Sequence, residues 1–175
     1  MEQGLIHIYC GEGKGKTTCA TGLAVRCAGA GGKVLWVQFL KNDTSGERKS
    51  LEQLKEITLV PGYEDVKFTF AMSEEEKQRA IAFYHRQFQE ITEQVKEQEY
   101  ALLVMDEAVG AIHSGMLDEE AVLQFLAGKP ESLEVVLTGR DPSDELLALA
   151  DYVTNMQKIK HPFDKGISAR KRIEW

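Results

Sequence analysis

The sequence is poor in cysteine, and its few cysteines are badly spaced for disulfides or zinc. Only three occur in 175 residues, and this odd number excludes a framework in which every cysteine is paired. No two of them stand two residues apart, so the spacing of a zinc knuckle is missing as well. We interpret Cys10, Cys19 and Cys27 as small buried apolar residues of a protein in the reducing cytoplasm.

An excess of basic charge and long hydrophobic runs are also lacking. The chain has 21 lysine and arginine residues against 28 aspartate and glutamate residues, whereas binders of duplex DNA or of anionic membranes are usually basic. Its apolar runs fall far short of the ~20 residues of a membrane span. The start of the sequence has no basic segment followed by a long apolar one, so we expect no signal peptide. We therefore expect no nucleic acid and no membrane as partner.

Two catalytic patterns are missing. The four histidines are scattered along the chain, which argues against a histidine metal cluster, and no G-x-S-x-G nucleophile elbow occurs. His161 precedes Pro162 and Phe163, for which an ordered turn with a structural role is the simplest interpretation. Hydrophobic residues make up 43% of the chain and charged residues 28%, which is typical of one globular domain over residues 1–175.

Short apolar runs alternate with amphipathic segments along the whole chain. Near-continuous apolar runs are typical of strands buried on both faces of a parallel sheet. The predicted fold is therefore an α/β fold with a mostly parallel β-sheet and helices on both faces. The expected strands are 5–9, 33–39, 66–70, 100–105, 133–137 and 151–154. The expected helices are 16–28, 51–54, 73–95 and 118–127, with a further one that Asp141 caps and Pro142 begins.

Four predicted loops follow the carboxyl ends of these strands. They are 11–16, 40–49, 106–116 and 138–142. Parallel sheets bind their ligands beyond the carboxyl ends of the strands, so these four loops are the expected location of a site.

A glycine-rich loop, Gly11–Thr18, stands between the first strand and the first helix, which is the context of a phosphate-binding P-loop. Glycines allow successive backbone N–H groups to point at phosphate oxygens. Lys16 adds a positive charge, and the Thr17 hydroxyl is a candidate ligand of Mg²⁺. The usual first glycine would fall on Cys10, so the motif is better described as G-x-x-x-G-K-T, one residue shorter. The alternative is a plain glycine-rich connection.

Two further strand ends carry charged residues. Asp106 and Glu107 follow an apolar strand and resemble a Walker B element, whose carboxylate lies near the metal and the phosphates. The alternative is that they only cap the next helix. Arg140 follows another strand and could reach phosphates or ribose, and the alternative is an exposed arginine in a turn.

Several separated motifs, in this order, make the chain similar to the ATP:corrinoid adenosyltransferases of the P-loop NTPase-like class. The resemblance covers nearly the whole chain. It rests on Gly11–Thr18, on 37–41 with 46–48, on 68–70, and on 105–107, 136–140, 150–154 and 160–167.

The resemblance implies a reaction in which the cobalt(I) of a corrinoid attacks the 5′-carbon of ATP. The adenosyl group moves to cobalt and intact triphosphate leaves, in adenosylcobalamin biosynthesis or salvage. In the family, the shortened loop is reported to hold ATP reversed. Cobalt(I) is already a strong nucleophile, so positioning and neutralisation of the triphosphate remain for the protein.

The resemblance also implies roles for individual residues. The expected catalytic residues are Lys16, Arg140 and Glu107, and the expected Mg²⁺ ligands are Thr17 and Asp106. The expected binding residues are Gly11, Glu12, Gly13, Lys14, Gly15, Lys16, Thr17, Thr18, Lys41, Phe68 and Phe70.

The two phenylalanines are assigned to the corrinoid. In the family, aromatic residues near Phe68 and Phe70 displace the lower axial ligand of cobalt, whereas strand core is the alternative role. The family also tends to form homodimers, and a cobalt-reducing flavoprotein is a compatible partner.

Two other functions remain open. One is a different small P-loop ATPase or kinase, for which Glu107 is the candidate base. The other is a non-catalytic ATP-binding carrier of a corrinoid, against which intact Lys16 and Thr17 argue.

Overall fold

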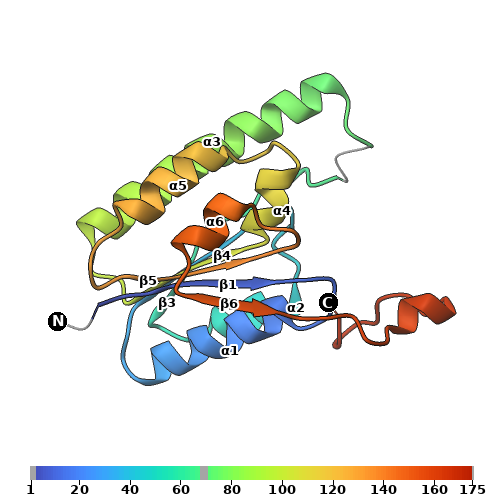
Figure 1. The fold of residues 1–175 in the computed structure, drawn as a ribbon, viewed down its shortest axis with the longest axis horizontal. Coiled ribbons are helices and arrows are strands. Elements are labelled where there is room, and N and C mark those ends of the chain that lie inside the picture. The colour runs from blue at the N-terminus through green and yellow to red at the C-terminus, as the bar shows by residue number, and fades with distance from the viewer. Residues whose placement is uncertain (1–2, 68–70, 175) are drawn as a thin grey trace.

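The computed structural model describes residues 3–67 and 71–174, which form a layered α/β structure (Figure 1). The strands are β1 (Ile6–Cys10), β2 (Val34–Gln38), β3 (Ile57–Leu59), β4 (Leu102–Asp106), β5 (Glu134–Thr138) and β6 (Tyr152–Asn155). The helices are α1 (Lys16–Gly29), α2 (Gly46–Leu51), α3 (Glu74–Glu97), α4 (Ala108–His113), α5 (Glu119–Ala127) and α6 (Asp144–Leu149), followed by the 3₁₀ turn η2 (Pro162–Lys165).

The six strands make one sheet in the order β3-β2-β4-β5-β1-β6, and all recorded pairs are parallel. The predicted parallel sheet is thereby confirmed. Since β2, β4, β5 and β1 are neighbours in this order, their carboxyl ends lie along one edge of the sheet. The loops that follow these four strands are the ones in which the sequence predicts a site.

Helices cover both faces of the sheet, as predicted (Figure 1). One face carries α1, whose buried residues Ala20, Ala24 and Ala28 recur every four positions and let the helix approach the strands closely. The other face carries α3, whose stripe from Tyr84 through Ile91 joins the larger hydrophobic core.

The start of α3 has a capping box, formed by Ser73 and by Glu76 three residues later. The Ser73 side chain accepts a hydrogen bond from the Glu76 backbone N–H at 3.2 Å, and the Glu76 carboxylate accepts from the Ser73 N–H at 2.9 Å. Two backbone donors that the helix leaves open are thereby satisfied.

The prediction of a strand at 66–70 is wrong for the two of these residues that the structure describes. Val66 and Lys67 are not in a strand, and Phe68–Phe70 lie outside the described residues. The strand of this region is β3, which has three residues and pairs with β2. A three-residue strand is too short to show alternation, so it left no pattern in the sequence.

Two helix boundaries also differ from prediction. The segment 41–49, predicted to be a loop, contains the start of α2, which ends at Leu51 where the sequence predicted a helix to begin. The cap of α6 is Ser143 and not Asp141, because the Ser143 hydroxyl accepts from the Leu146 N–H at 3.1 Å. Asp141 has φ 50°, a left-handed conformation that aspartate tolerates in a turn.

The cysteine prediction is correct for one residue of three. Cys10 is buried, Cys27 is partly exposed, and Cys19 is exposed because it lies beside the alanine stripe of α1 and not on it. The turn expected at His161 is confirmed as η2, where the His161 ring accepts from the Phe163 N–H. Within the described residues, no helix is both long and apolar enough to cross a bilayer.

We expect Ser73→Ala to lower the free energy of unfolding by about 1 kcal/mol, because it removes the cap of the longest described helix. Chemical denaturation followed by circular dichroism measures this change. Ser45→Ala is the matched control, since Ser45 precedes α2 without a capping hydrogen bond from its side chain. Equal losses in the two variants would contradict a specific role of the cap.

Candidate functional site

The loop between β1 and α1 requires its glycines. Gly11 and Gly15 have φ of 98° and 122°, values that favour glycine over any residue with a side chain. A Cβ atom on Gly13 would stand 2.5 Å from the Met156 carbonyl oxygen, which accepts a hydrogen bond from the Gly13 N–H at 2.6 Å. The segment that follows β6 therefore supports the loop from behind and leaves room for nothing larger than glycine.

Lys16 is the first residue of α1, and its side chain bends back over the loop. Its ammonium group donates to the carbonyl oxygens of Gly11 and Gly13 at 2.6 and 2.9 Å. Burial lowers the pKa of Lys16, and the nearby Arg140 guanidinium lowers it further. An ammonium that is short of water and beside a second cation is well placed to bind phosphate.

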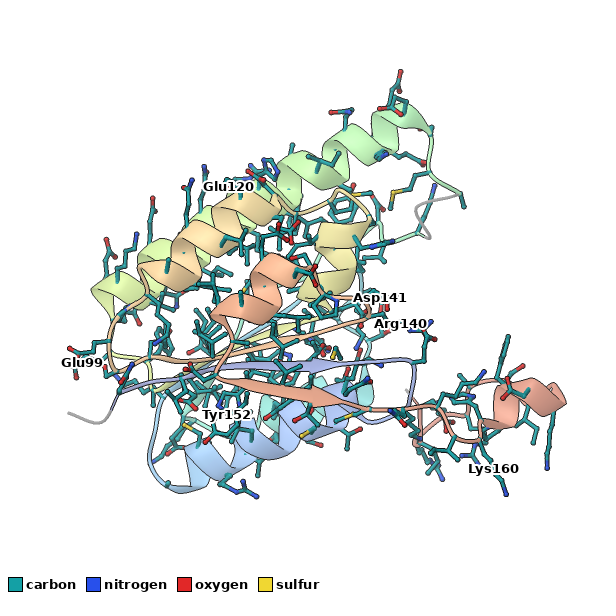
Figure 2. The ribbon with its side chains drawn as sticks, viewed as in Figure 1. Glu99, Glu120, Arg140, Asp141, Tyr152 and Lys160 are labelled. Atoms are coloured by element: carbon teal, nitrogen blue, oxygen red, sulfur yellow. The ribbon has the colours of Figure 1, made fainter. Side chains whose placement is uncertain are left out.

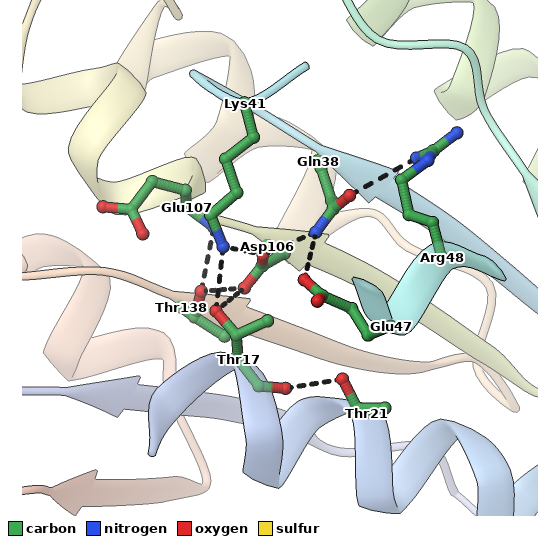
Figure 3. Close-up of polar contacts among 9 residues, drawn as sticks. All are labelled: Thr17, Thr21, Gln38, Lys41, Glu47, Arg48, Asp106, Glu107 and Thr138. Atoms are coloured by element: carbon green, nitrogen blue, oxygen red, sulfur yellow. Dashed lines mark hydrogen bonds and ion pairs between the residues drawn. The ribbon is translucent and has the colours of Figure 1, made fainter. Parts of the chain in front are cut away.

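Asp106, the last residue of β4, is fully buried and is the centre of a polar network (Figure 3). Its Oδ1 accepts from the hydroxyls of Thr17 at 2.9 Å and Thr138 at 2.7 Å. Its Oδ2 accepts from the Lys41 ammonium at 2.8 Å and from the Gln38 amide at 3.2 Å. The network joins α1 to the ends of three neighbouring strands.

Glu107 follows directly and adopts φ 60°, which turns its side chain away from Asp106 (Figure 3). Its backbone N–H donates to the Thr138 hydroxyl at 2.8 Å, which helps to hold this conformation. Burial raises the pKa of Glu107, and the neighbouring Asp106 carboxylate adds to this, against the opposing effect of Lys41. The alternative that Glu107 caps the next helix is not supported, since it makes no side-chain capping bond to α4.

Arg140 follows β5 and lies at the same end of the sheet (Figure 2). Its guanidinium is 3.0 Å from the carboxylate of Glu12, and both side chains are more than half exposed. Arg140 is therefore brought to the P-loop through Glu12 and makes no direct contact with the Asp106 network.

The C-terminal segment folds back onto the P-loop (Figure 1). The Lys14 ammonium donates to the Glu174 carboxylate at 2.8 Å and to the Ile173 carbonyl oxygen at 3.2 Å. The backbone N–H and the guanidinium of Arg170 bind the same carboxylate. Thr18 is exposed and lines the cavity between α1 and this segment.

A larger cavity, of about 520 Å³, opens beside the network on the side of α4. Its surface is mainly apolar, with Lys41 and Glu107 at the edge near the P-loop. It is lined by Leu40, Lys41, Val66, Lys67, Glu107, Gly110 and Ser114. Apolar walls with a few convergent polar groups are typical of a site for an organic ligand.

Sequence reasoning did not assign Gln38, Thr138 and Glu47 to the site. Gln38 and Thr138 bind Asp106, and the Gln38 amide also donates to Glu47 at 3.1 Å. A signal was present, because in each of the two strands a run of three or four buried apolar residues ends in a single buried polar residue. Phe68 and Phe70, assigned to the corrinoid, lie outside the described residues.

The chemistry of the donors suits a magnesium ion. The Thr17 hydroxyl and the Asp106 carboxylate meet at 2.9 Å, and hydroxyl and carboxylate oxygens are the ligands that Mg²⁺ takes beside phosphates and water. The Lys41 ammonium contacts the Thr17 hydroxyl oxygen and the other carboxylate oxygen, Oδ2, so both residues already face a positive charge. Among the described residues, no group of three or more His, Cys, Asp or Glu side chains forms a metal site, so a metal ion here would take its remaining ligands from water or phosphate.

A parallel sheet with a P-loop after β1 and a buried carboxylate after β4 defines a P-loop nucleotide-binding protein. Residues 2–175 match the model of the family described as ATP:corrinoid adenosyltransferase BtuR/CobO/CobP. The chain belongs to this family, a family of transferases, as its motifs predict.

Individual relatives agree over nearly the full chain. The chain is 32% identical to a corrinoid adenosyltransferase of Sinorhizobium sp. over 99% of its own length and 81% of that protein. It is 32% identical to the one of Pseudomonas aeruginosa, with 99% and 85% covered, and 31% identical to the one of Escherichia coli K12, with 99% and 87% covered.

Solved structures support the fold alone. The cytoplasmic domain of EssC superposes with a TM-score of 0.52 at 16% identity, over 96% of this chain and 34% of that one. EccC of Thermomonospora curvata, described as ATPases 2 and 3 in complex with a signal sequence peptide, gives the same TM-score and identity over 96% and 35%. This chain thus spans about a third of either protein.

We expect Glu107→Gln to raise the melting temperature at pH 7–8. The raised pKa means that the ionised form of Glu107 disfavours the folded state, so wild type loses stability as pH rises through that pKa. The advantage of the variant should shrink as pH falls toward about 4, the ordinary range of a glutamate, where both proteins are uncharged at this position. Melting curves across this range measure it, and a difference that does not change with pH would contradict the burial argument.

Proposed function

We propose that this member of the family transfers the 5′-deoxyadenosyl group of ATP to the cobalt(I) of a corrinoid at the edge formed by β1, β2, β4 and β5, and releases triphosphate. The observation that carries the proposal is the position of the shortened P-loop. Thr17 of the loop binds Asp106, and Lys41 and Glu107 lead from there to the apolar cavity. The triphosphate and a bulky organic substrate therefore have adjacent binding sites.

In this proposal the P-loop binds the triphosphate. Residues Gly11–Thr18 supply backbone N–H groups and the positive end of α1, and the Lys16 ammonium supplies a charge-assisted hydrogen bond. The Arg140 guanidinium leaves the Glu12 carboxylate and binds a phosphate oxygen instead. These groups stabilise the charge that develops on the leaving triphosphate, which is the main demand of a reaction whose nucleophile needs no base.

A magnesium ion is part of the proposal, with Thr17 and Asp106 as its protein ligands. When bound, it would neutralise charge on the phosphates. Thr138 and Gln38 hold Asp106 in place from the two neighbouring strands. Glu107 lies at the mouth of the cavity, where it can orient the ribose end of ATP.

The corrinoid is assigned to the cavity of about 520 Å³. Val66 and Lys67 line it and immediately precede Phe68 in the sequence. This supports the assignment of Phe68 and Phe70 to the corrinoid face, as the family resemblance implies.

Assembly and location are also proposals. We propose a homodimer in a reducing cytoplasm, served by a cobalt-reducing flavoprotein, with residues 1–175 acting as one domain. All four residues of the edge strand β6 are exposed, and Tyr152 and Val153 present apolar surface there at 51% and 48% exposure. An open edge of this kind invites pairing with a second chain.

We expect Lys16→Ala to abolish turnover while the fold survives. Among the described residues, the side chain binds only carbonyl oxygens of the loop, and loss of its contact to triphosphate should raise the transition-state barrier by roughly 2–4 kcal/mol. Formation of adenosylcobalamin from ATP and chemically reduced cobalamin, followed by absorbance, measures this loss. Lys49→Ala, on the exposed side of α2, is the control. A folded Lys16→Ala protein with normal activity would contradict the assignment of Gly11–Thr18 as a P-loop.

We expect ATP to be consumed without formation of ADP or orthophosphate. Attack at the 5′-carbon breaks the bond between that carbon and the oxygen of the α-phosphate, so the three phosphates leave together. Phosphorus NMR of the reaction mixture distinguishes triphosphate from ADP. Stoichiometric ADP and orthophosphate would favour the ATPase alternative, with Glu107 as its base.

A further inference from the structure

The contacts of Lys41 carry an inference that rests on the proposed function and deepens it. Asp106 is fully buried, and a buried carboxylate is strongly destabilising unless a positive partner and hydrogen bonds satisfy it. Among the described residues, Lys41 is the one cation in ion-pair contact with Asp106, at 2.8 Å. The ammonium of Lys41 is therefore the positive partner of this buried carboxylate.

The same ammonium also binds the second proposed metal ligand. Lys41 Nζ lies 3.0 Å from the Thr17 hydroxyl oxygen, in addition to its contact with Asp106 Oδ2 (Figure 3). A divalent cation bound between this hydroxyl and this carboxylate would compete with Lys41 for the Thr17 oxygen. It would also repel the Lys41 ammonium at close range, and this repulsion favours departure of the ammonium.

The backbone before Lys41 explains how the side chain reaches this place. Leu40 has φ 54°, a left-handed conformation that is strained for a leucine. The Tyr84 hydroxyl holds it by accepting from the Leu40 N–H at 3.1 Å. The turn sends Lys41 back across the end of the sheet and not away from it.

The Lys41 ammonium also has a second accessible position. Its side chain is 30% exposed and lines both the cavity beside Thr17 and the cavity of about 520 Å³ beside Glu107. A lysine side chain has four methylene groups joined by rotatable bonds, so the ammonium can leave Asp106 without movement of the sheet. On the cavity side the Glu107 carboxylate lines the same cavity as Lys41.

We infer that Lys41 is a displaceable internal cation. It holds Asp106 and Thr17 in position while no metal is bound, and a divalent cation that enters with ATP drives it toward Glu107 and the substrate cavity. Lys41 thereby couples occupation of the metal site to delivery of a positive charge to the reacting end of the nucleotide.

Manganese binding tests the inference without nucleotide or corrinoid. Electron paramagnetic resonance titration of the apo protein with MnCl₂ measures affinity. Lys41→Met keeps the length of the side chain and removes the charge, so no ammonium must be displaced, and we expect Mn²⁺ to bind at least tenfold more tightly. Lys49→Met, on the exposed side of α2, is the matched control and should bind as wild type does.

A second measurement uses the wild-type chain and does not depend on the fold of a variant. Lys41 should react faster with an amine-acylating reagent when Mg²⁺ or Mn²⁺ is present, because its ammonium is released, and peptide mass spectrometry measures the rate at this residue. Lys49 should react at the same rate with and without metal. An unchanged or slower rate at Lys41, or unchanged Mn²⁺ affinity of a folded Lys41→Met protein, overturns the inference.

Asp106→Asn separates this inference from the proposed function. If that variant loses Mn²⁺ binding while Lys41→Met fails to strengthen it, the metal site stands and only the displacement by metal is wrong. If Asp106→Asn binds Mn²⁺ as wild type does, the assignment of the metal to Asp106 is wrong, and the inference about Lys41 falls with it.

Discussion

The burial of one carboxylate, that of Asp106, is the constraint on which the rest of the site depends. It has no contact with water and takes hydrogen bonds from four side chains on four separate segments of the chain: Thr17, Gln38, Lys41 and Thr138. Two of these donors end the strands on either side of β4 in the sheet. The strand order therefore does more than build a core, because it brings together the partners that one buried charge requires.

The P-loop depends on the sheet in a similar way. Gly13 donates to the carbonyl oxygen of Met156, just beyond β6, and a Cβ on Gly11 would stand 2.2 Å from the side-chain oxygen of Asn155. Asn155, at the end of the edge strand β6, and Met156 after it thus limit the shape of the P-loop on the side that faces β6. A change in β6 that shifts Met156 is expected to alter phosphate binding even though no residue of β6 lines the cavity of about 520 Å³.

Features encoded by neighbouring residues were predictable from sequence. The P-loop, the parallel sheet and the capping box at Ser73 follow from spacings of a few residues. The three-residue strand β3 and the Ser143 cap were missed. A short edge strand has no period, and Asp141 and Ser143, two residues apart in one turn, are both suitable cap residues. Thr17, Lys41 and Asp106 were assigned to the site from sequence, but the hydrogen bonds of Gln38 and Thr138 to Asp106 were not predicted, because these side chains meet only through the register of the strands.

The charges at the site give the proposed metal a role although the proposed reaction needs no activated water. Lys16, Lys41, Asp106 and Glu107 carry two positive and two negative formal charges, so together they have little net positive charge to offer a triphosphate. A divalent cation bound at Asp106 would change this balance twice. It would add its own two charges, and it would replace Lys41 as the cation beside Asp106. The released ammonium would then be available to the substrate, and the positive charge around the triphosphate would rise by more than the metal alone supplies.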